Sequence, residues 1–146
     1  MMGPTAPRTE VGRMTVAEQL EDAMNAHDLA AFLACFHDDY RSEQPVHPGR
    51  GFGGRDQVEA NWSAIFAGVP DFAAELVRVT GREEEWSEWH WTGTRRDGDA
   101  LDMAGVMICG IRDGRIAWGR LYIEPLEAEP EGIDAAVRRM AGAPPE

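Results

Sequence analysis

The sequence lacks the features that identify several common classes of protein. It has only two cysteines, and His27, His37 and His47 lie ten residues apart, whereas metal ligands on helices and strands lie two to four residues apart. The glycines between positions 51 and 54 lack the Gly-Lys-Ser/Thr ending of a phosphate loop. No apolar run approaches the roughly 20 residues of a membrane span, and no apolar signal segment stands near the N-terminus. We therefore expect no metal, no cofactor and no membrane partner.

The sequence is also poor in positive charge. Its 14 basic residues face 26 acidic ones, which gives a formal net charge of −12. The nearest approaches to a basic cluster, Arg95-Arg96 and Arg138-Arg139, each sit close to acidic residues. Because an acidic surface repels phosphate backbones and anionic lipids, we expect no nucleic acid partner.

Both cysteines, Cys35 and Cys109, lie inside apolar stretches. This placement is typical of free, buried thiols in a reduced cytoplasm, so we expect a cytoplasmic protein. A disulfide between them is the alternative.

The length of 146 residues suits one domain. Residues 1–12 are polar and rich in Pro and Gly, which predicts a disordered leader. The domain then covers residues 13–126. Residues 127–146 turn acidic and Pro/Gly-rich and form a tail, in which residues 133–140 are expected to make a short helix.

Apolar residues recur at helical spacing in the first part of the domain and at every second residue in the last part. A capping box at Thr15 and Glu18 begins the first helix, and apolar residues at helical spacing predict a second helix that includes Phe36 and a third over about 56–67. Tyr40 begins a short strand. After Pro70 the period changes to two, which predicts strands over 72–80, 84–94, 101–112 and 115–124. The last three form an antiparallel meander, with apolar residues on both faces. One face must cover the helices, and the other is expected to cover a partner subunit in a homodimer.

Three segments resemble one known superfamily. They are the helical corner at 24–32, the run from Cys35 to Tyr40, and the glycine-rich entry to the third helix at 51–56. With the hairpin at 111–118 they are similar to the nuclear transport factor 2-like superfamily, and to its SnoaL-like (polyketide cyclase-like) domains. The resemblance implies an α+β fold, a cone-shaped barrel in which three N-terminal helices pack in the concavity of a curved, mostly antiparallel sheet. It also implies an apolar pocket for a small apolar molecule.

The resemblance supplies a fold without the family's catalytic residues. The positions that match those of the ketosteroid isomerases hold Gln44, Leu20 and Met107, so the protein is not expected to be that isomerase. The strand pair of the limonene epoxide hydrolases resembles Glu88 and His90, but the third position of that set falls near Leu121. The scaffold itself hosts many unrelated activities.

Glu88 and His90 are the best candidates for chemistry. They lie two apart in a strand, so both side chains project from one face, where a carboxylate and an imidazole can act as acid/base partners. Trp86 shares that face. The alternative is a charged pair on an exposed face.

The expected pocket is soft and rich in methionine, a residue whose flexible side chain adapts to irregular ligands. Its expected lining is Tyr40, Gln44, Trp62, Phe66, Trp86, Met103, Met107 and Leu121. A filled core without a cavity is the alternative. The sequence thus leaves three functions open: a cofactor-free isomerase, cyclase or hydrolase acting by proton transfer, a non-catalytic module that binds a small ligand, and a dimerising scaffold.

Overall fold

The computed structural model describes residues 14–144, so the expected leader at 1–12 lies outside the described residues. Helices α2 (Val16–Ala26) and α3 (Leu29–Leu33) come first, followed by strand β1 (Phe36–Glu43). A short 3-10 turn, strand β2 and helix α4 lead into the meander, and a last helix ends the described chain. The 3-10 turn covers Pro48–Arg50, and β2 (Phe52–Gly53) and α4 (Arg55–Gly68) follow it. The meander consists of β3 (Ala73–Thr80), β4 (Glu84–Thr94), β5 (Ala100–Arg112) and β6 (Arg115–Pro125), and the last helix is α5 (Ile133–Met140).

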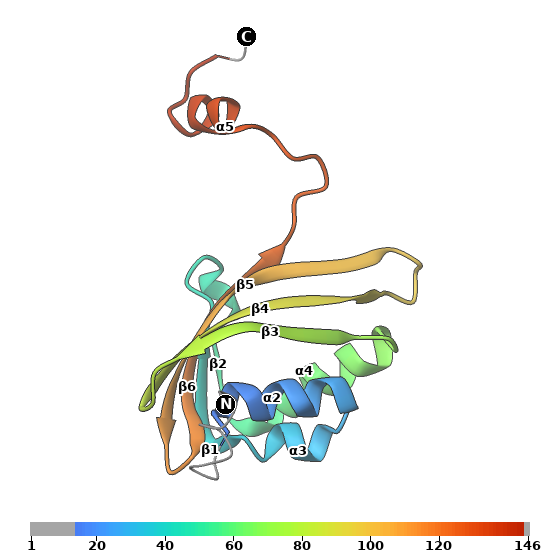
Figure 1. The fold of residues 1–146 in the computed structure, drawn as a ribbon, viewed down its shortest axis with the longest axis vertical. Helices are drawn as coiled ribbons and strands as arrows, with labels where there is room; N and C mark the ends of the chain where they lie inside the picture. Colours follow the sequence, from blue (N-terminus) through green and yellow to red (C-terminus); the bar gives the residue numbers. More distant parts are fainter. Residues whose placement is uncertain (1–13, 145–146) are drawn as a thin grey trace, which may run out of the picture.

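The six strands form one sheet in the order β2-β1-β6-β5-β4-β3. Every neighbouring pair is antiparallel except β1 and β6, which run parallel. The sheet is strongly curved, and α2, α3 and α4 lie in its hollow (Figure 1). It is not closed, since β2 and β3 are free edges. The expected α+β architecture with three helices in a concavity is confirmed.

Two sets of acceptors satisfy the first turn of α2. Thr15 accepts the amide of Glu18 at 3.0 Å while the Glu18 carboxylate accepts the amide of Thr15 at 2.9 Å, which is the predicted capping box. The amides of Val16 and Ala17 both donate to the carboxylate of Glu85 at 2.9 Å. Glu85 is a buried residue near the start of β4, so this contact joins the start of the helix to the sheet.

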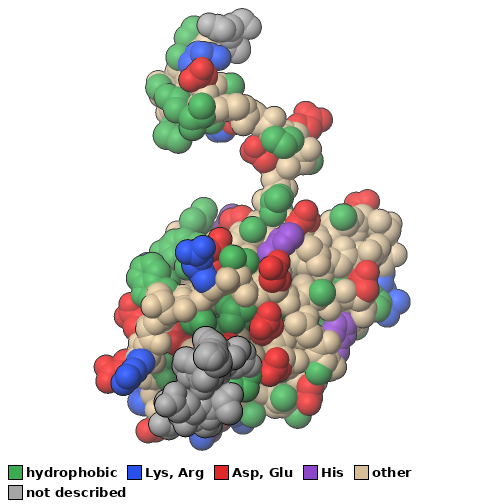
Figure 2. All heavy atoms as spheres, in the orientation of Figure 1, with side chains coloured by type: hydrophobic (Ala, Val, Ile, Leu, Met, Phe, Trp, Pro, Cys, Tyr) green, Lys and Arg blue, Asp and Glu red, His purple; other side chains and the backbone are tan. Residues whose placement is uncertain are grey.

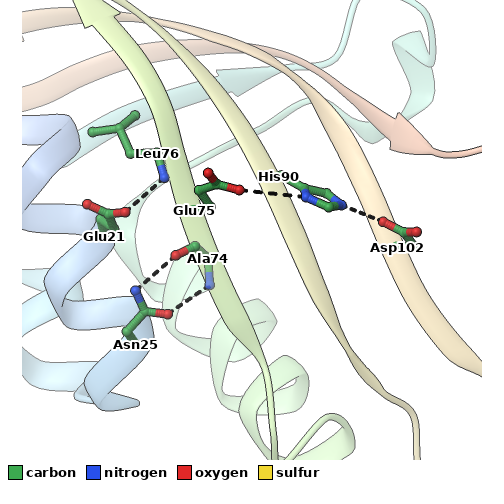
Figure 3. A network of polar contacts seen from close by, with 7 residues as sticks. All are labelled: Glu21, Asn25, Ala74, Glu75, Leu76, His90 and Asp102. Carbon is green, nitrogen blue, oxygen red and sulfur yellow. Dashed lines mark hydrogen bonds and ion pairs between the residues drawn. The ribbon is translucent and has the colours of Figure 1, made fainter.

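Helix α2 also covers the free edge of β3. The Asn25 side chain donates to the Ala74 carbonyl at 2.9 Å and accepts the Ala74 amide at 2.8 Å, and Glu21 accepts the Leu76 amide at 2.8 Å (Figure 3). An uncovered edge strand offers unpaired amides and carbonyls to other chains. The two side chains therefore protect this edge and fix the helix along it.

The second helix is shorter than its apolar stripe predicts. It ends at Leu33, and β1 begins at Phe36, within the run that helical spacing includes. The Cys35 carbonyl accepts the amide of Ile116 at 2.7 Å, so the backbone is already paired with β6 at that point. Sequence period cannot show this pairing, because the partner strand lies at the far end of the domain.

The burial of alternate residues along β4 shows which face of the sheet is inside. Ser87, Trp89 and Trp91 are buried against the helices, whereas Trp86 is 48% exposed on the opposite face. The β5–β6 hairpin turns at Asp113 and Gly114, whose φ angles of 56° and 73° suit the Asp-Gly pair that predicts this turn. No helix among residues 14–144 is long and apolar enough to cross a membrane.

Candidate functional site

A cavity of about 590 Å³ lies between the helices and the inner face of the sheet. This volume is within the range of about 300–1,000 Å³ typical of sites for small molecules. Its walls come from α2, α3, β1 and α4, together with Gln44 after β1 and single residues of β2, β4, β5 and β6. They are Leu20, Met24, Phe32, Phe36, Tyr40, Ser42, Gln44, Phe52, Gln57, Val58, Ala60, Asn61, Trp62, Ala64, Ile65, Trp91, Met107 and Leu121.

None of these lining residues carries a charge at neutral pH. Aromatic rings that meet at angles form part of the wall. Trp62 contacts the rings of Phe32 at 4.7 Å and Trp91 at 5.5 Å between centroids, the second edge to face at 83°. A charged ligand would have to give up its water here without an opposite charge to replace it, which is costly. The cavity therefore suits a neutral molecule.

Tyr40 is the one lining residue with an ionisable side chain. Burial raises the pKa of its phenol well above the ordinary range, although a hydrogen bond with Ser42 opposes this shift. Its hydroxyl occupies the space over Gly119, where a Cβ atom would lie 2.6 Å from the phenol oxygen. Tyr40 therefore stays protonated at neutral pH and offers a neutral hydroxyl.

Carboxamide side chains supply most of the remaining polarity of the wall. The Gln57 amide nitrogen donates to the Asn61 oxygen at 2.8 Å, one turn further along α4. The Gln44 oxygen accepts from Arg50 at 3.0 Å. The other half of each amide has capacity left for a neutral hydroxyl or carbonyl group of a ligand.

Two tryptophans of β4 differ in their polar partners. The Trp89 indole nitrogen donates to the Ser87 hydroxyl at 2.8 Å. The Trp91 indole nitrogen is buried and has no hydrogen-bond acceptor among the described residues. An unpaired buried donor of this kind costs about 1–3 kcal/mol, so the cavity wall carries a local cost to stability.

The predicted lining residues divide into two groups. Tyr40, Gln44, Trp62, Met107 and Leu121 lie on the cavity wall. Phe66, Met103 and Trp86 do not line it.

Phe66 is turned away from the cavity and stacks on His27, at 4.7 Å between ring centroids. Met103 borders a separate hollow at the end of the sheet, beside Pro125 and Leu126. Trp86 is on the outer face. The expectation that these three line the same cavity as Met107 is corrected accordingly.

Glu88 and His90 also lie on the outer face of β4, with side chains 46% and 39% exposed. His90 sits between two carboxylates, with Nε2 2.6 Å from Asp102 and Nδ1 3.8 Å from Glu75 (Figure 3). Glu88 pairs instead with Arg78 at 3.3 Å. The pair does share a face with Trp86, but the sheet separates that face from the cavity. This corrects the expectation that Trp86 lines the pocket and matches the alternative of a charged pair on an exposed face.

Sequence reasoning missed part of the wall, mainly the side of α4 that faces the cavity. Gln57 and Asn61 are one turn apart there, and this i, i+4 spacing of two carboxamides is the signal that could have revealed it. Trp91 was missed because Trp86, on the opposite face of β4, was the tryptophan of this strand expected to line the pocket. In the structure Trp91 and Met107 both line the cavity.

The two thiols of the described residues stay protonated. Cys35 and Cys109 are free and buried, and burial raises their pKa values to about 11 and about 12, so both stay as thiols. No group of three or more His, Cys, Asp or Glu residues within residues 14–144 could hold a metal ion.

Fold and cavity together define a class: an α+β protein in which a curved sheet and three helices enclose an apolar chamber, as in nuclear transport factor 2-like proteins. The sequence model of the SnoaL-like domain matches residues 16–118. The chain belongs to the SnoaL-like family. A comparison with proteins of curated function finds no match.

Solved structures with the same fold are distant in sequence. An NTF2-like protein of unknown function from Exiguobacterium sp. 255-15 is 18% identical over 75% of this chain and 98% of its own, with a TM-score of 0.65. IdmH from Streptomyces antibioticus, a candidate polyketide cyclase, is 18% identical over 75% and 89%, with a TM-score of 0.64. Rv0760c from Mycobacterium tuberculosis, in complex with estradiol-17β-hemisuccinate, is 19% identical over 72% and 88%, with a TM-score of 0.62. At these identities the likeness establishes the fold alone.

Proposed function

We propose that this protein binds a neutral, mainly apolar small molecule in the central cavity and that the cavity performs no acid/base chemistry. The observation that carries the proposal is the composition of the wall, in which no described residue is charged. Proton transfer in a closed site needs a group whose pKa lies near the working pH. The only ionisable lining group, Tyr40, has a pKa raised far above that range by burial.

The polar groups of the wall set the expected chemistry of the ligand. The carboxamides of Gln57, Asn61 and Gln44 favour a ligand that carries a hydroxyl or carbonyl group on an otherwise apolar body. The ligand of the Mycobacterium tuberculosis protein joins an apolar steroid body to a charged hemisuccinate end, so its body alone supports the size and apolarity proposed here.

An enzyme that uses Glu88 and His90 is the second candidate. It is favoured by the short contact of 2.6 Å between His90 and Asp102, which can orient the imidazole as a base. Because both residues lie on the outer face, its substrate would bind there and not in the cavity. In this case His90→Ala would abolish turnover and leave the affinity for the substrate within a few-fold.

The cavity can be tested with two probes of the same shape and different charge, 2-acetonaphthone and 2-naphthoate. Calorimetric titration of the wild-type protein should show binding of the neutral ketone and at least tenfold weaker binding of the carboxylate, because the wall offers no cation. Equal affinities, or a preference for the carboxylate, would contradict a neutral cavity.

A matched pair of variants places the binding site. Ala64 is exposed and lines the cavity, so Ala64→Trp should obstruct it without disturbing the core. Ser63 is its exposed neighbour on α4 and does not line the cavity, so Ser63→Trp is the control. We expect Ala64→Trp to weaken binding of 2-acetonaphthone at least tenfold and Ser63→Trp to leave it within twofold. Equal effects would place the ligand outside the cavity.

A further inference from the structure

The indole nitrogen of Trp91 is the one buried polar side-chain atom, among residues 14–144, that has no hydrogen-bond partner. Trp91 is 7% exposed, and its side chain forms part of the cavity wall. Native proteins pair the large majority of their buried polar atoms, so this exception needs an explanation. Because an indole N–H can only donate a hydrogen bond, the missing partner is an acceptor.

The side chains packed against Trp91 are aromatic. The rings of Trp62, Phe72 and Trp89 lie with their centroids 5.5, 5.9 and 6.3 Å from the Trp91 ring. An aromatic face accepts an N–H only weakly. These three rings therefore do not replace an oxygen acceptor.

The sequence of β4 explains why Trp89 is paired and Trp91 is not. Side chains two residues apart in a strand project from the same face, and Trp89 donates to Ser87, two residues before it, at 2.8 Å. The residue two before Trp91 is Trp89 itself, whose side chain carries no acceptor. The run Ser-Glu-Trp-His-Trp thus satisfies the first indole and leaves the second one open.

The charged side chains of β4 that could accept this hydrogen bond lie on the other side of the sheet. Glu88 and His90 alternate with the two tryptophans and project from the outer face. Figure 2 shows many carboxylates on the surface of the molecule, whereas no described residue of the cavity wall is charged. An acceptor for Trp91 therefore has to come from a molecule in the cavity.

A single water molecule is a poor partner at this position. Buried waters are typically held by about two to four polar groups, and the rings around Trp91 give a water few such groups to bind. A ligand oxygen is held in place by the apolar body to which it is attached. It can therefore pair with Trp91 without further polar partners.

We propose that Trp91 donates its N–H to an acceptor oxygen of the ligand and so determines the ligand class: a neutral, mainly apolar molecule with a ketone, ester or ether oxygen. This role rests on the proposed function, since it requires a ligand in the cavity. The nitrogen is covered in the structure, so this edge of the indole turns toward the cavity on binding, and the volume of about 590 Å³ provides the room. An analogue without the oxygen is disfavoured because the buried donor then stays unpaired.

The test compares two probes of the same shape, 2-acetonaphthone and 2-isopropenylnaphthalene, in which a CH₂ group replaces the ketone oxygen. Equilibrium dialysis of the full chain gives the ratio of their affinities, in which changes of apolar packing largely cancel. Trp91→Phe should lower the preference for the ketone about three- to tenfold, because it removes the donor and keeps an aromatic ring.

Trp89→Phe is the matched control. Its N–H is held by Ser87, and Trp89 is not among the residues that line the cavity. The affinity ratio of this variant should stay within about twofold of the wild type. An equal change of the ratio in both variants, or an unchanged ratio in Trp91→Phe, would overturn the role of Trp91.

Indole ¹⁵N–¹H spectra of the wild-type protein test the same contact without a substitution. The Trp91 N–H proton should move downfield when the ketone binds and much less when the hydrocarbon binds, because only the ketone offers an acceptor. The Trp89 signal should respond equally to both probes. Equal shifts of Trp91 with both probes would overturn its role and leave the cavity as the binding site, whereas failure of both probes to bind would overturn the proposed function as well.

Discussion

The two inner tryptophans of β4 allow a direct test of how the hydrogen bonding of a buried indole N–H affects the stability of the protein. Trp89 and Trp91 lie on the same face of one strand and are 1% and 7% exposed. Replacing either by Phe removes a similar part of the indole ring, so the loss of buried apolar surface and the resulting void are comparable. The two substitutions differ in the indole N–H that each removes.

The difference in stability follows from the partners of that N–H. Trp89→Phe breaks the 2.8 Å hydrogen bond to Ser87 inside the core. Trp91→Phe removes a donor that has no acceptor among the described residues. Removing one partner of a buried hydrogen bond costs about 1–3 kcal/mol, whereas removing an unpaired donor recovers part of a similar cost. We therefore expect Trp89→Phe to be the more destabilising by about 1–3 kcal/mol.

Urea unfolding of the ligand-free protein, followed by circular dichroism, measures both free energies under the same conditions. The slopes of the two variants should agree, so that the midpoints alone report the difference. If both variants lose the same free energy within about 0.5 kcal/mol, or if Trp91→Phe loses more, the assignment of Trp91 as an unsatisfied donor is wrong.

Two further predictions concern the contacts that hold α2. Burial raises the pKa of the Glu85 carboxyl, although the amides of Val16 and Ala17 oppose the shift. Its protonation therefore stabilises the fold, fully below about pH 4.3, and this contribution is lost as pH rises through the folded-state pKa. Glu85→Gln should flatten that part of a stability-pH curve from urea titrations, and the exposed Glu83→Gln should not; parallel curves for wild type and Glu85→Gln would refute this. Asn25→Ala leaves both backbone groups of Ala74 without their partner. We expect it to lower the free energy of unfolding by about 1–3 kcal/mol, measured by thermal or urea unfolding. An unchanged midpoint would show that water replaces the side-chain amide.

The spacing of apolar residues in the sequence predicted the helices and strands well, because each of them has a local hydrophobic repeat. The capping box at Thr15 and Glu18 and the turn at Asp113 and Gly114 depend on neighbours only, and both are present. The parallel pairing of β1 with β6 joins distant segments, and no local pattern indicates it.

The candidate site was harder to predict, since it depends on which face of β4 is inside. Bulky residues occupy both faces, with Trp86 on one and Trp89 and Trp91 on the other. Only the packing of the helices decides between them. Tyr40, Trp62, Met107 and Leu121 were predicted from β1, α4 and the meander beyond β4 without this choice, and they line the cavity, whereas Phe66 and Met103 do not. His90 did need this choice and lies outside.

The most direct test of the cavity uses methionine methyl groups as reporters. Met24 and Met107 line the cavity, whereas Met103 lies beside another hollow and Met140 is on the exposed helix. Selectively ¹³C-methyl-labelled methionine protein is titrated with 2-acetonaphthone and followed by NMR. The account predicts saturable shifts of the Met24 and Met107 resonances while Met103 and Met140 stay in place. Saturable binding that shifts Met103 or Met140 and leaves Met24 and Met107 unchanged, or no binding at all, would contradict it.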